Sequence, residues 1–322
     1  MPDLFAAYED ALLYAVPDGE PTSILTGHEF ECVAVGTDAV YAGTFDEGLL
    51  RSKDGDDAWE VVLPDAAVTA IEVDPLDPET IYAGTEPSHV FRSEDSGESW
   101  TECESFQDLE SKEHWRFPPR PETHHVRWLE RDPTHDGRLY AAIEAGALVR
   151  STDRGETWLD RVPTGPYDTH GMATHPDRPA EVWAAAGDGF AHTRDGGETW
   201  EWPEDGLDRT YCWSVALDPA DPGVEVVSAA SGPRDAHSPP GTSKVFRRVD
   251  GGPFEEAMDG LPAPEGLLRA VLARGEIAGE FYAATNHGLY RSTDTGASWR
   301  QLHESWPGRL RRQAPSGLAV RP

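Results

Sequence analysis

The sequence predicts an all-β chain that folds as a seven-bladed β-propeller of four-stranded antiparallel blades, with the last blade shared between the N- and C-termini. Three observations predict this fold: a short motif that recurs along almost the whole chain, short β-type segments between its copies, and complementary strand patterns at the two chain ends. Residues 1–322 then form a single propeller domain, because one blade cannot bury both of its faces without neighbours.

The recurring motif reads Ser-x-Asp-x-Gly-x-x-Trp. Four copies keep this pattern, with Thr for Ser in one of them, and begin at Ser93, Ser151, Thr193 and Ser292. Two further copies are degraded. In 52–59 the glycine comes early, and 248–253 keeps Asp250 and Gly252 but lacks the tryptophan at the expected place. The copies recur about every 42 residues, which is typical of propeller blades, with two longer intervals.

The motif suits a tight turn between two strands. A carboxylate and a hydroxyl can bond exposed backbone N–H groups, a glycine can take positive φ, and the tryptophan can anchor the next strand. We therefore expect the motif aspartates to hold turns and not to act on a substrate. The glycines of 250–252 have the same explanation, and no helix follows them, so the sequence predicts no phosphate-binding loop there.

Strand patterns between the motifs complete the blades. Segments 68–75, 80–85 and 90–93 precede one motif, and the strand after its tryptophan makes four per repeat. Six motifs account for six blades. The segment 315–322 repeats the innermost-strand pattern, whereas the outer-strand patterns lie at 11–16 and 23–26. A seventh blade closed by both termini is favoured over a six-bladed ring, because it removes a sheet edge.

The two long intervals contain insertions at 104–123 and 231–243, both rich in Pro, Ser and charged residues. In a propeller the motif turns all lie on one face, while the connections between blades and the turns between second and third strands lie on the other. Both insertions fall in these latter classes. We therefore expect them on the face opposite the motif turns, where a ligand would bind.

The chain is strongly acidic, with 59 acidic and 27 basic residues and a net charge of −32. The acidic residues are scattered, which favours adaptation of the whole surface to high salt, and such a surface repels nucleic acid. No basic leader and no apolar run of about 18 residues occur, so we expect a cytoplasmic protein without a membrane partner.

Aligning the innermost strands places one residue of each at the channel mouth. These ring positions are Glu31, Thr69, Arg127, His170, Trp213, Arg269 and Ser316. Most are charged or aromatic, whereas packing alone would favour small or apolar residues. Arg127 and Arg269 suit bidentate contacts with a carboxylate or phosphate, and Trp213 offers a surface on which a sugar can stack. The alternative is a plug of ion pairs between these arginines and Glu31.

Neighbouring segments extend this candidate site. The further ligand-binding residues that we expect are His124, His125, Tyr211, Arg234 and His237. Hydrolysis would need a titratable group beside a carboxylate, and the catalytic candidates are His170 with Glu31 or Glu144. We expect no cofactor and assign no metal. A metal site is the alternative, with possible ligands His124, His125, His170 and His237.

The motifs and their spacing resemble the Asp-box, or BNR, repeat superfamily over essentially the whole chain. That superfamily contains sialidases, xyloglucan-type glycosidases, sorting-receptor ectodomains and a photosystem assembly factor, so the resemblance implies a propeller and leaves the activity open. Within it the chain is similar to soluble prokaryotic propellers labelled sialidase-like or glycosyl hydrolases, through the stretch 115–127. The acidic composition is typical of a halophile.

Sialidase activity itself does not carry over. Sialidases use a Phe/Tyr-Arg-Ile-Pro motif, three arginines and a Tyr nucleophile backed by Glu, and the segment 117–120 is no substitute. Tyr167 and Tyr211 are conceivable nucleophiles, but no spacing ties either to a Glu. Two functions stay open: binding of a small anionic or sugar-like ligand at the channel mouth, with or without glycosidase-like hydrolysis, and a non-enzymatic protein-interaction or assembly-factor scaffold.

Overall fold

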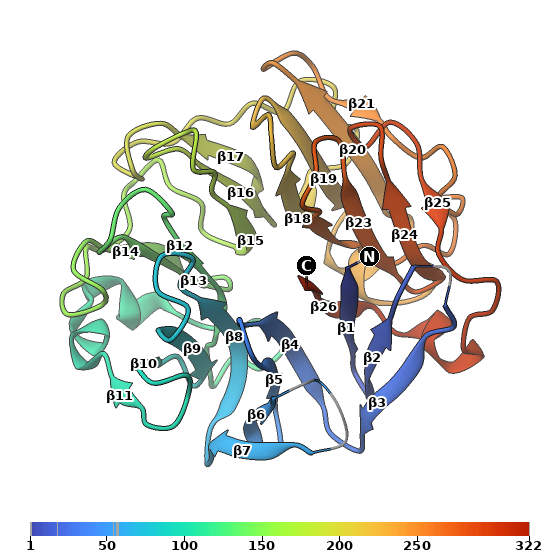
Figure 1. Cartoon of the computed structure of the whole chain (residues 1–322). Helices are drawn as coiled ribbons and strands as arrows, with labels where there is room; N and C mark the ends of the chain where they lie inside the picture. Colours follow the sequence, from blue (N-terminus) through green and yellow to red (C-terminus); the bar gives the residue numbers. More distant parts are fainter. Residues whose placement is uncertain (1, 18, 54, 56–57, 322) are drawn as a thin grey trace.

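The computed structural model describes residues 2–17, 19–53, 55 and 58–321. Seven antiparallel sheets form a ring, with the first strand of each sheet toward the centre (Figure 1). The structure confirms the predicted seven-bladed β-propeller. Among the described residues, no helix is long and apolar enough to cross a membrane.

Blade 1 is shared between the chain ends, as predicted. Its innermost strand is the C-terminal β26 (Pro315–Arg321), and the outer strands are β1 (Asp3–Tyr8), β2 (Ala11–Ala15) and β3 (Thr22–Thr26). Strand β26 pairs with β1 in antiparallel register. β1 precedes the two N-terminal strands that the sequence indicated. Residues from opposite ends of the chain therefore close the ring.

The remaining blades follow in chain order. Blade 2 contains β4 (Phe30–Val35), β5 (Val40–Thr44), β6 (Gly48–Ser52) and β7 (Glu60–Leu63). Blade 3 contains β8 (Ala67–Val73), β9 (Ile81–Glu86), β10 (Val90–Ser93) and β11 (Thr101–Glu102). Blade 6 contains β18 (Tyr211–Leu217), β19 (Val224–Ala230), β20 (Lys244–Val249) and β21 (Glu255–Glu256). Blade 7 contains β22 (Val271–Arg274), β23 (Phe281–Thr285), β24 (Gly288–Ser292) and β25 (Arg300–Gln301).

Blades 4 and 5 have three full strands each. Blade 4 contains β12 (Val126–Arg131), β13 (Leu139–Ile143) and β14 (Ala147–Ser151), and blade 5 contains β15 (Thr169–Ala173), β16 (Val182–Ala186) and β17 (Gly189–Thr193). A single bridge stands in the place of the fourth strand, Arg150 with Leu159 in blade 4 and His192 with Glu201 in blade 5. In these two blades the outermost strand is thus reduced to a single bridged pair of residues.

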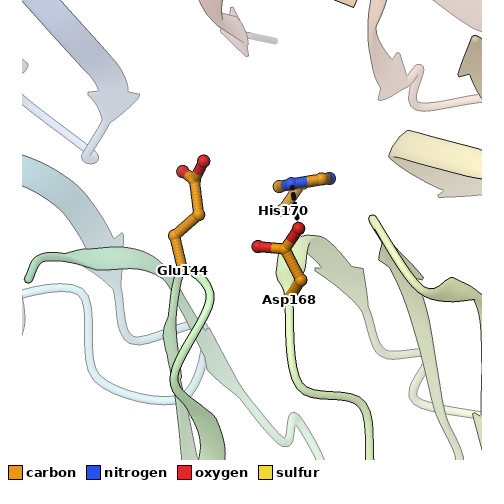
Figure 2. A group of neighbouring side chains, drawn as sticks. All are labelled: Glu144, Asp168 and His170. Atoms are coloured by element: carbon orange, nitrogen blue, oxygen red, sulfur yellow. Dashed lines mark ion pairs between the residues drawn. The ribbon is translucent and has the colours of Figure 1, made fainter. Parts of the chain in front are cut away.

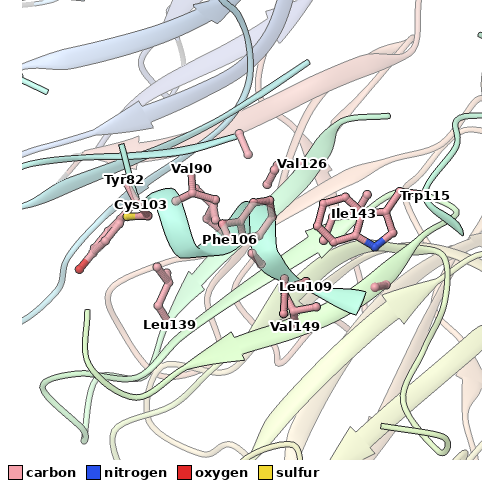
Figure 3. Packing of buried hydrophobic residues seen from close by; sticks show 14 residues of the cluster. Tyr82, Val90, Cys103, Phe106, Leu109, Trp115, Val126, Leu139, Ile143 and Val149 are labelled. Carbon is pink, nitrogen blue, oxygen red and sulfur yellow. The ribbon is translucent and has the colours of Figure 1, made fainter. Parts of the chain in front are cut away.

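The core lies between the blades. In β5, β13, β16 and β23 every residue is buried, because a neighbouring blade covers each face of the sheet. The insertion 104–123 adds to this core through two short 3-10 helices, Glu104–Asp108 and Glu110–His114. Phe106 and Trp115 from this insertion pack between blades 3 and 4 against Val126 (Figure 3).

The clean motif copies share one pattern of hydrogen bonds. The hydroxyl of Ser151 donates to Asp153 (2.7 Å) and accepts from the N–H of Gly155 (2.8 Å). Asp153 also accepts from the N–H (2.9 Å) and the hydroxyl (2.5 Å) of Thr157. The same bonds recur in the turns that begin at Ser93, Thr193 and Ser292. These contacts agree with a structural role. In the copy at 52–59, residues 54, 56 and 57 lie outside the described residues.

Candidate functional site

Six of the seven predicted ring residues occupy β-bulges. The register of the innermost strand shifts by one residue at Glu31, Thr69, Arg127, His170, Trp213 and Ser316. A bulge leaves one residue without a partner on the adjacent strand and redirects its side chain. The seventh residue, Arg269, lies just before β22. The ring therefore arises from one local distortion repeated around the channel.

Several ring side chains also join one blade to the next. Each donates to the carbonyl oxygen of the residue that precedes the next ring position. These pairs are Thr69 to Val126 (2.6 Å), His170 to Cys212 (2.7 Å), Arg269 to Pro315 (3.1 Å) and Ser316 to Phe30 (2.9 Å). This part of the ring fixes the relative positions of the blades, so its members have a structural role whatever else they do.

His170 is held in one tautomer. The carbonyl of Cys212 can only accept, so Nδ1 of His170 carries the proton and Nε2 accepts from the hydroxyl of Tyr211, 3.2 Å away. The His170 ring is stacked on Trp213 with the ring centres 4.4 Å apart, and none of the residue is exposed. His170, predicted as catalytic, therefore lies beneath the site and positions Tyr211 and Trp213.

A directional chain of hydrogen bonds crosses the mouth. Arg269, which can only donate, bonds to Nδ1 of His237, so the proton of His237 is on Nε2, 3.4 Å from the Tyr211 hydroxyl. The chain therefore runs from Arg269 through His237 and Tyr211 to His170 and ends at the Cys212 carbonyl. His237 lies on α1 (Pro233–His237), so the insertion 231–243 supplies one side of the mouth.

Two pKa shifts agree with this chain. Burial and the charge of Arg269 lower the pKa of His237 to about 2, which keeps the ring neutral. Burial, followed by the charges of Glu144 and Asp168, raises the pKa of Tyr211 well above its usual range. A phenol that resists ionisation is a poor nucleophile, so the structure gives no support to Tyr211 as the sialidase-type nucleophile.

Glu144 is the ionised carboxylate of the site. It follows β13, accepts a hydrogen bond from Nε2 of His125 (3.0 Å) and lies 3.9 Å from Nε of Arg127. Burial alone would raise the pKa of Glu144. The hydrogen bond from His125 and the charge of Arg127 outweigh burial and hold that pKa well below its usual range.

Asp168 is a site residue that the sequence analysis did not select. Its Oδ2 lies 3.6 Å from Nε2 of His170, and its Oδ1 accepts from the N–H of Ala145 (2.8 Å). The chain can bring Asp168 here because Gly187 has no side chain: a Cβ there would lie 2.1 Å from Oδ2 of Asp168 and 2.9 Å from the Tyr211 ring. The sequence does place the carboxylate of Asp168 two residues before the ring position His170, and this short spacing could have indicated that Asp168 belongs to the site.

Glu144, Asp168 and His170 form a group of possible metal ligands, with one ligand atom of each within 4.8 Å of the others (Figure 2). The surroundings favour an anion over a cation. His125 already donates a hydrogen bond to Glu144, the Arg127 guanidinium lies 3.9 Å from the same carboxylate, and Nε2 of His170 already faces the Tyr211 hydroxyl. A guanidinium this close opposes the binding of a further positive charge.

Arg127 and Arg269 both lie against Trp213, with their guanidinium carbons 4.8 Å and 4.0 Å from the ring centre. Arg127 is only 6% exposed, yet its side chain makes no hydrogen bond with any described residue, and its Nε is both buried and unpaired. Its nearest carboxylates, Glu31 and Glu144, are 3.9 Å away. Burial and the charge of Arg127 lower the pKa of Arg269 to about 9. The predicted ion-pair plug with Glu31 is therefore not formed through hydrogen bonds.

The insertion 104–123 forms another part of the rim. Arg120 donates two hydrogen bonds to Glu86 (2.9 Å and 2.5 Å), and the Phe117 ring packs edge-on against His125 at 4.7 Å. Next to the ring of seven channel-mouth residues, a cavity of about 50 Å³ lies between Glu31, Arg127 and other inner-strand residues. This space suffices for a few water molecules, so a larger ligand would sit above the ring.

Two predicted residues do not join the site. Nδ1 of His124 accepts from the N–H of Ser88 (3.3 Å), and its ring packs against Trp115. Arg234 is exposed on α1. Of the four histidines named as an alternative metal set, His124 contacts Ser88 and Trp115, whereas His125 contacts Glu144 and Phe117.

Comparison with known proteins shows the fold alone. No family model matches the chain, and no curated protein matches it. The structure is similar to an ancestral GH74 enzyme (TM-score 0.68, 15% identity, covering 91% of this chain and 41% of that one). It is also similar to a GH74 xyloglucanase from Xanthomonas campestris (TM-score 0.63, 16% identity, covering 97% of this chain and 52% of that one). A third similar structure is YCF48 bound to D1 peptide (TM-score 0.59, 16% identity, covering 89% of this chain and 84% of that one). The chain thus spans about half or less of the GH74 enzymes. Fold and site together define a seven-bladed propeller with a polar channel mouth.

Proposed function

We propose that the channel mouth binds a small ligand through an anionic group, held by Arg127 and Arg269 beside Trp213. One observation carries this proposal: Arg127 is buried and its side chain has no hydrogen-bond partner among the described residues. Buried polar groups in proteins are almost always paired, and an unpaired guanidinium is costly. A ligand carboxylate or phosphate supplies the missing partner.

The two arginines act together in this proposal. Each guanidinium disfavours the charge of the other, as the lowered pKa of Arg269 indicates. An anion between them removes that repulsion and accepts hydrogen bonds from both, and such charge-assisted bonds are among the strongest in proteins. Binding is then expected to restore the ordinary basicity of Arg269.

The acidic side of the mouth indicates the rest of the ligand. Glu144 is ionised and 8% exposed, and Asp168 lies beside it. Carboxylates only accept, so they would bind hydroxyl or N–H groups. A compact molecule with an anionic group and neighbouring hydroxyls, such as an acidic sugar, satisfies both sides. This supports the anionic or sugar-like ligand that the sequence predicts.

Glycoside hydrolysis is a second candidate, because oxygen atoms of Glu144 and Asp168 lie within 4.8 Å of each other. Retaining glycosidases hold their two carboxyl groups about 5 Å apart, and one of the two must stay protonated to act as the acid. The lowered pKa of Glu144 suits only the nucleophile. Release of p-nitrophenol from nitrophenyl uronides, lost in Glu144→Gln, would support this activity, and no release above the blank would exclude it.

A protein-binding scaffold is the alternative, since the similar YCF48 structure holds a D1 peptide. Residues 118–122 at the tip of the insertion 104–123 are exposed on the rim. A pull-down at high salt, with and without those residues, separates this alternative from the small-molecule site. Loss of a specific partner together with unchanged ligand binding would favour the scaffold.

The wider assignment is also a proposal. The four identical motif turns support membership of the Asp-box repeat superfamily, and the net charge of −32 supports a halophilic, cytoplasmic protein. Unfolding measured from low to high salt tests the halophilic part. A stability that does not increase with salt would contradict it.

The binding proposal is tested by calorimetric titration with uronic acids and phosphorylated metabolites at constant high salt. Arg127→Ala with Arg269→Ala should weaken binding at least about 100-fold, because two charge-assisted contacts are lost. Arg234→Ala on the same face is the matched control and should bind as the parent does. Equal affinity in the double variant and the control would overturn the proposal.

A further inference from the structure

A repeated contact joins neighbouring blades on the face of the motif turns. An arginine on the third strand of one blade donates to a backbone carbonyl in the turn of the next blade. The pairs are Arg51 with Ser96, Arg92 with Arg154, Arg150 with Gly197, and Arg247 with Thr295. These contacts use the charge of each arginine within the structure and leave nothing for a ligand.

The junction between blades 5 and 6 departs from this pattern. On β17 the arginine position is taken by His192, which pairs across the strands with Trp183 as Arg51 pairs with Tyr41 in blade 2. His192 stacks on Trp183 with the ring centres 4.6 Å apart. It makes no hydrogen bond to the turn of blade 6, so the usual contact is missing at this junction among the described residues.

The facing turn of blade 6 is altered as well. Arg248 stands where the clean motifs have Ser or Thr, and it pairs across the strands with Glu225. In the clean motifs that cross-strand partner is apolar, as Leu139 is for Ser151. The positive-φ pair, Asp250 and Gly251, also comes one residue earlier along this turn. The ion pair between Arg248 and Glu225 thus takes the place that a hydroxyl side chain and its apolar cross-strand neighbour occupy in the clean motifs.

A groove of about 260 Å³ lies between the two blades, lined by His192, Arg248 and Glu225 among others. Arg248 is 5% exposed and His192 3% exposed. Nε of Arg248 and Nδ1 of His192 are buried and have no hydrogen-bond partner among the described residues. Buried polar atoms are normally paired, so these two atoms call for a partner from outside the described chain.

The two unpaired atoms have opposite requirements. Nε2 of His192 lies 3.0 Å from a carboxylate oxygen of Glu181, so it carries the ring proton. Burial, followed by the charges of Arg194 and Arg248, lowers the pKa of His192 to about 4, so the ring is neutral near pH 7. Nδ1 is then an acceptor, whereas Nε of Arg248 is a donor. The ligand must accept from one and donate to the other.

We propose that this groove binds a phosphate group that carries one proton, either as inorganic phosphate or as a small phosphomonoester. A phosphate oxygen accepts from Nε of Arg248, and the P–OH donates to Nδ1 of His192. Arg178 and Arg194 line the groove and supply further positive charge in a chain of net charge −32. Sulfate, which has no proton near neutral pH, lacks the donor that His192 requires.

The acidic groups around the groove are compatible with this ligand. Glu181 is engaged by Nε2 of His192, and Arg248 donates to Glu225 (3.3 Å). Burial raises the pKa of Glu225 to about 7, so this group is partly neutral when the anion binds. Asp250 lies in the turn beside Gly223. The glycines of this turn hold its backbone conformation, and the side chains of Arg248 and His192 would hold the phosphate.

The test is calorimetric titration with inorganic phosphate, glycerol phosphate and sulfate near pH 6, in protein carrying Arg127→Ala and Arg269→Ala to remove the channel-mouth site. At this pH the His192 ring is neutral, and a phosphomonoester, whose second pKa is about 6, keeps its P–OH proton in about half of the molecules. Phosphate should bind with one-to-one stoichiometry and at least tenfold more tightly than sulfate. Tighter glycerol phosphate than phosphate would assign the ester as ligand, and the reverse would assign the free ion.

Two variants identify the groove. Arg248→Ser restores the residue of the clean motifs, so the turn should fold, and phosphate should bind about 10- to 100-fold more weakly. His192→Phe keeps the ring on Trp183 and should abolish the preference for phosphate over sulfate. The proposal fails if Arg248→Ser binds phosphate as its parent does, or if the parent binds phosphate and sulfate equally.

Discussion

Two arginines on one strand, β12, show how differently the two ends of the channel are built. Arg131 is 1% exposed and donates to Asp74 (2.8 Å) and to the carbonyls of Arg138 (2.5 Å) and Asp136 (2.6 Å). Arg127, four residues earlier along the strand, is 6% exposed, and its side chain has no hydrogen bond to any described residue. The same residue type, similarly buried, has its donors hydrogen-bonded at one end, whereas at the other end it has no hydrogen bond to a described residue and only two carboxylates 3.9 Å away.

The comparison distinguishes a buried arginine that stabilises the fold from a buried arginine that is available to a ligand. A guanidinium whose donors all have partners within the fold holds strands and turns in place. One that lacks partners destabilises the fold and is retained where a ligand completes it. Each prediction below tests this contrast, from the largest expected effect to the smallest.

Arg131→Leu should destabilise the fold by about 3–5 kcal/mol, because it leaves the buried carboxylate of Asp74 without its partner. Unfolding in guanidinium chloride, followed by tryptophan fluorescence, measures the loss. A change below about 1 kcal/mol would show that the paired end of β12 is not the structural one.

Gly187→Ala should destabilise by about 3 kcal/mol and disturb the mouth, because the new Cβ would lie 2.1 Å from Oδ2 of Asp168. Gly232→Ala is the matched control, since no atom lies within 4 Å of its Cβ position. Comparable stability of the two variants would mean that Asp168 is not held against Gly187.

Asp153→Ala should destabilise by about 2 kcal/mol, because one partly exposed carboxylate accepts hydrogen bonds from Ser151 and Thr157. Asp153→Asn keeps part of the acceptor capacity and should lose less. Thermal unfolding of both variants provides the measurement. An Asn variant no more stable than the Ala variant would contradict the role given to the carboxylate.

Stability should also fall by up to about 2 kcal/mol between pH 5 and pH 8, because burial raises the pKa of Glu130 from 4.5 to about 7. The sign follows from the folded pKa exceeding the unfolded one: the contribution is full below pH 4.5 and is lost as the pH rises through 7. Glu130→Gln should flatten this part of the pH profile. An unchanged slope in Glu130→Gln would assign the loss to another group.

Arg127→Leu should change the stability of the unliganded protein by less than about 1 kcal/mol, the smallest effect, because it removes a buried guanidinium that has no hydrogen bond to a described residue but also takes a positive charge away from Glu144. The same variant should lose affinity for the anionic ligand. Destabilisation comparable to that of Arg131→Leu would place both arginines in the same structural class and remove the basis of the channel-mouth site.

Much of the fold and part of the site follow from the sequence. The motif copies predicted the blades, because their hydrogen bonds join residues only two to four positions apart and so depend on the local sequence, as between Ser151 and Asp153. The strand patterns at the two ends predicted the shared blade. The alignment of innermost strands also placed Arg127, Trp213 and Arg269 together at one mouth.

The tertiary structure alone decided which of these residues are free to bind. His170 is buried and donates a hydrogen bond to the carbonyl of Cys212 from the next blade, and Asp168 enters the site because Gly187 leaves room for it. Likewise, Arg248 and His192 belong to different blades. The sequence around either residue does not show that the other blade offers no hydrogen-bond partner to it among the described residues. A local pattern fixes which groups a turn can bond, whereas pairing across blades depends on segments far apart in the chain.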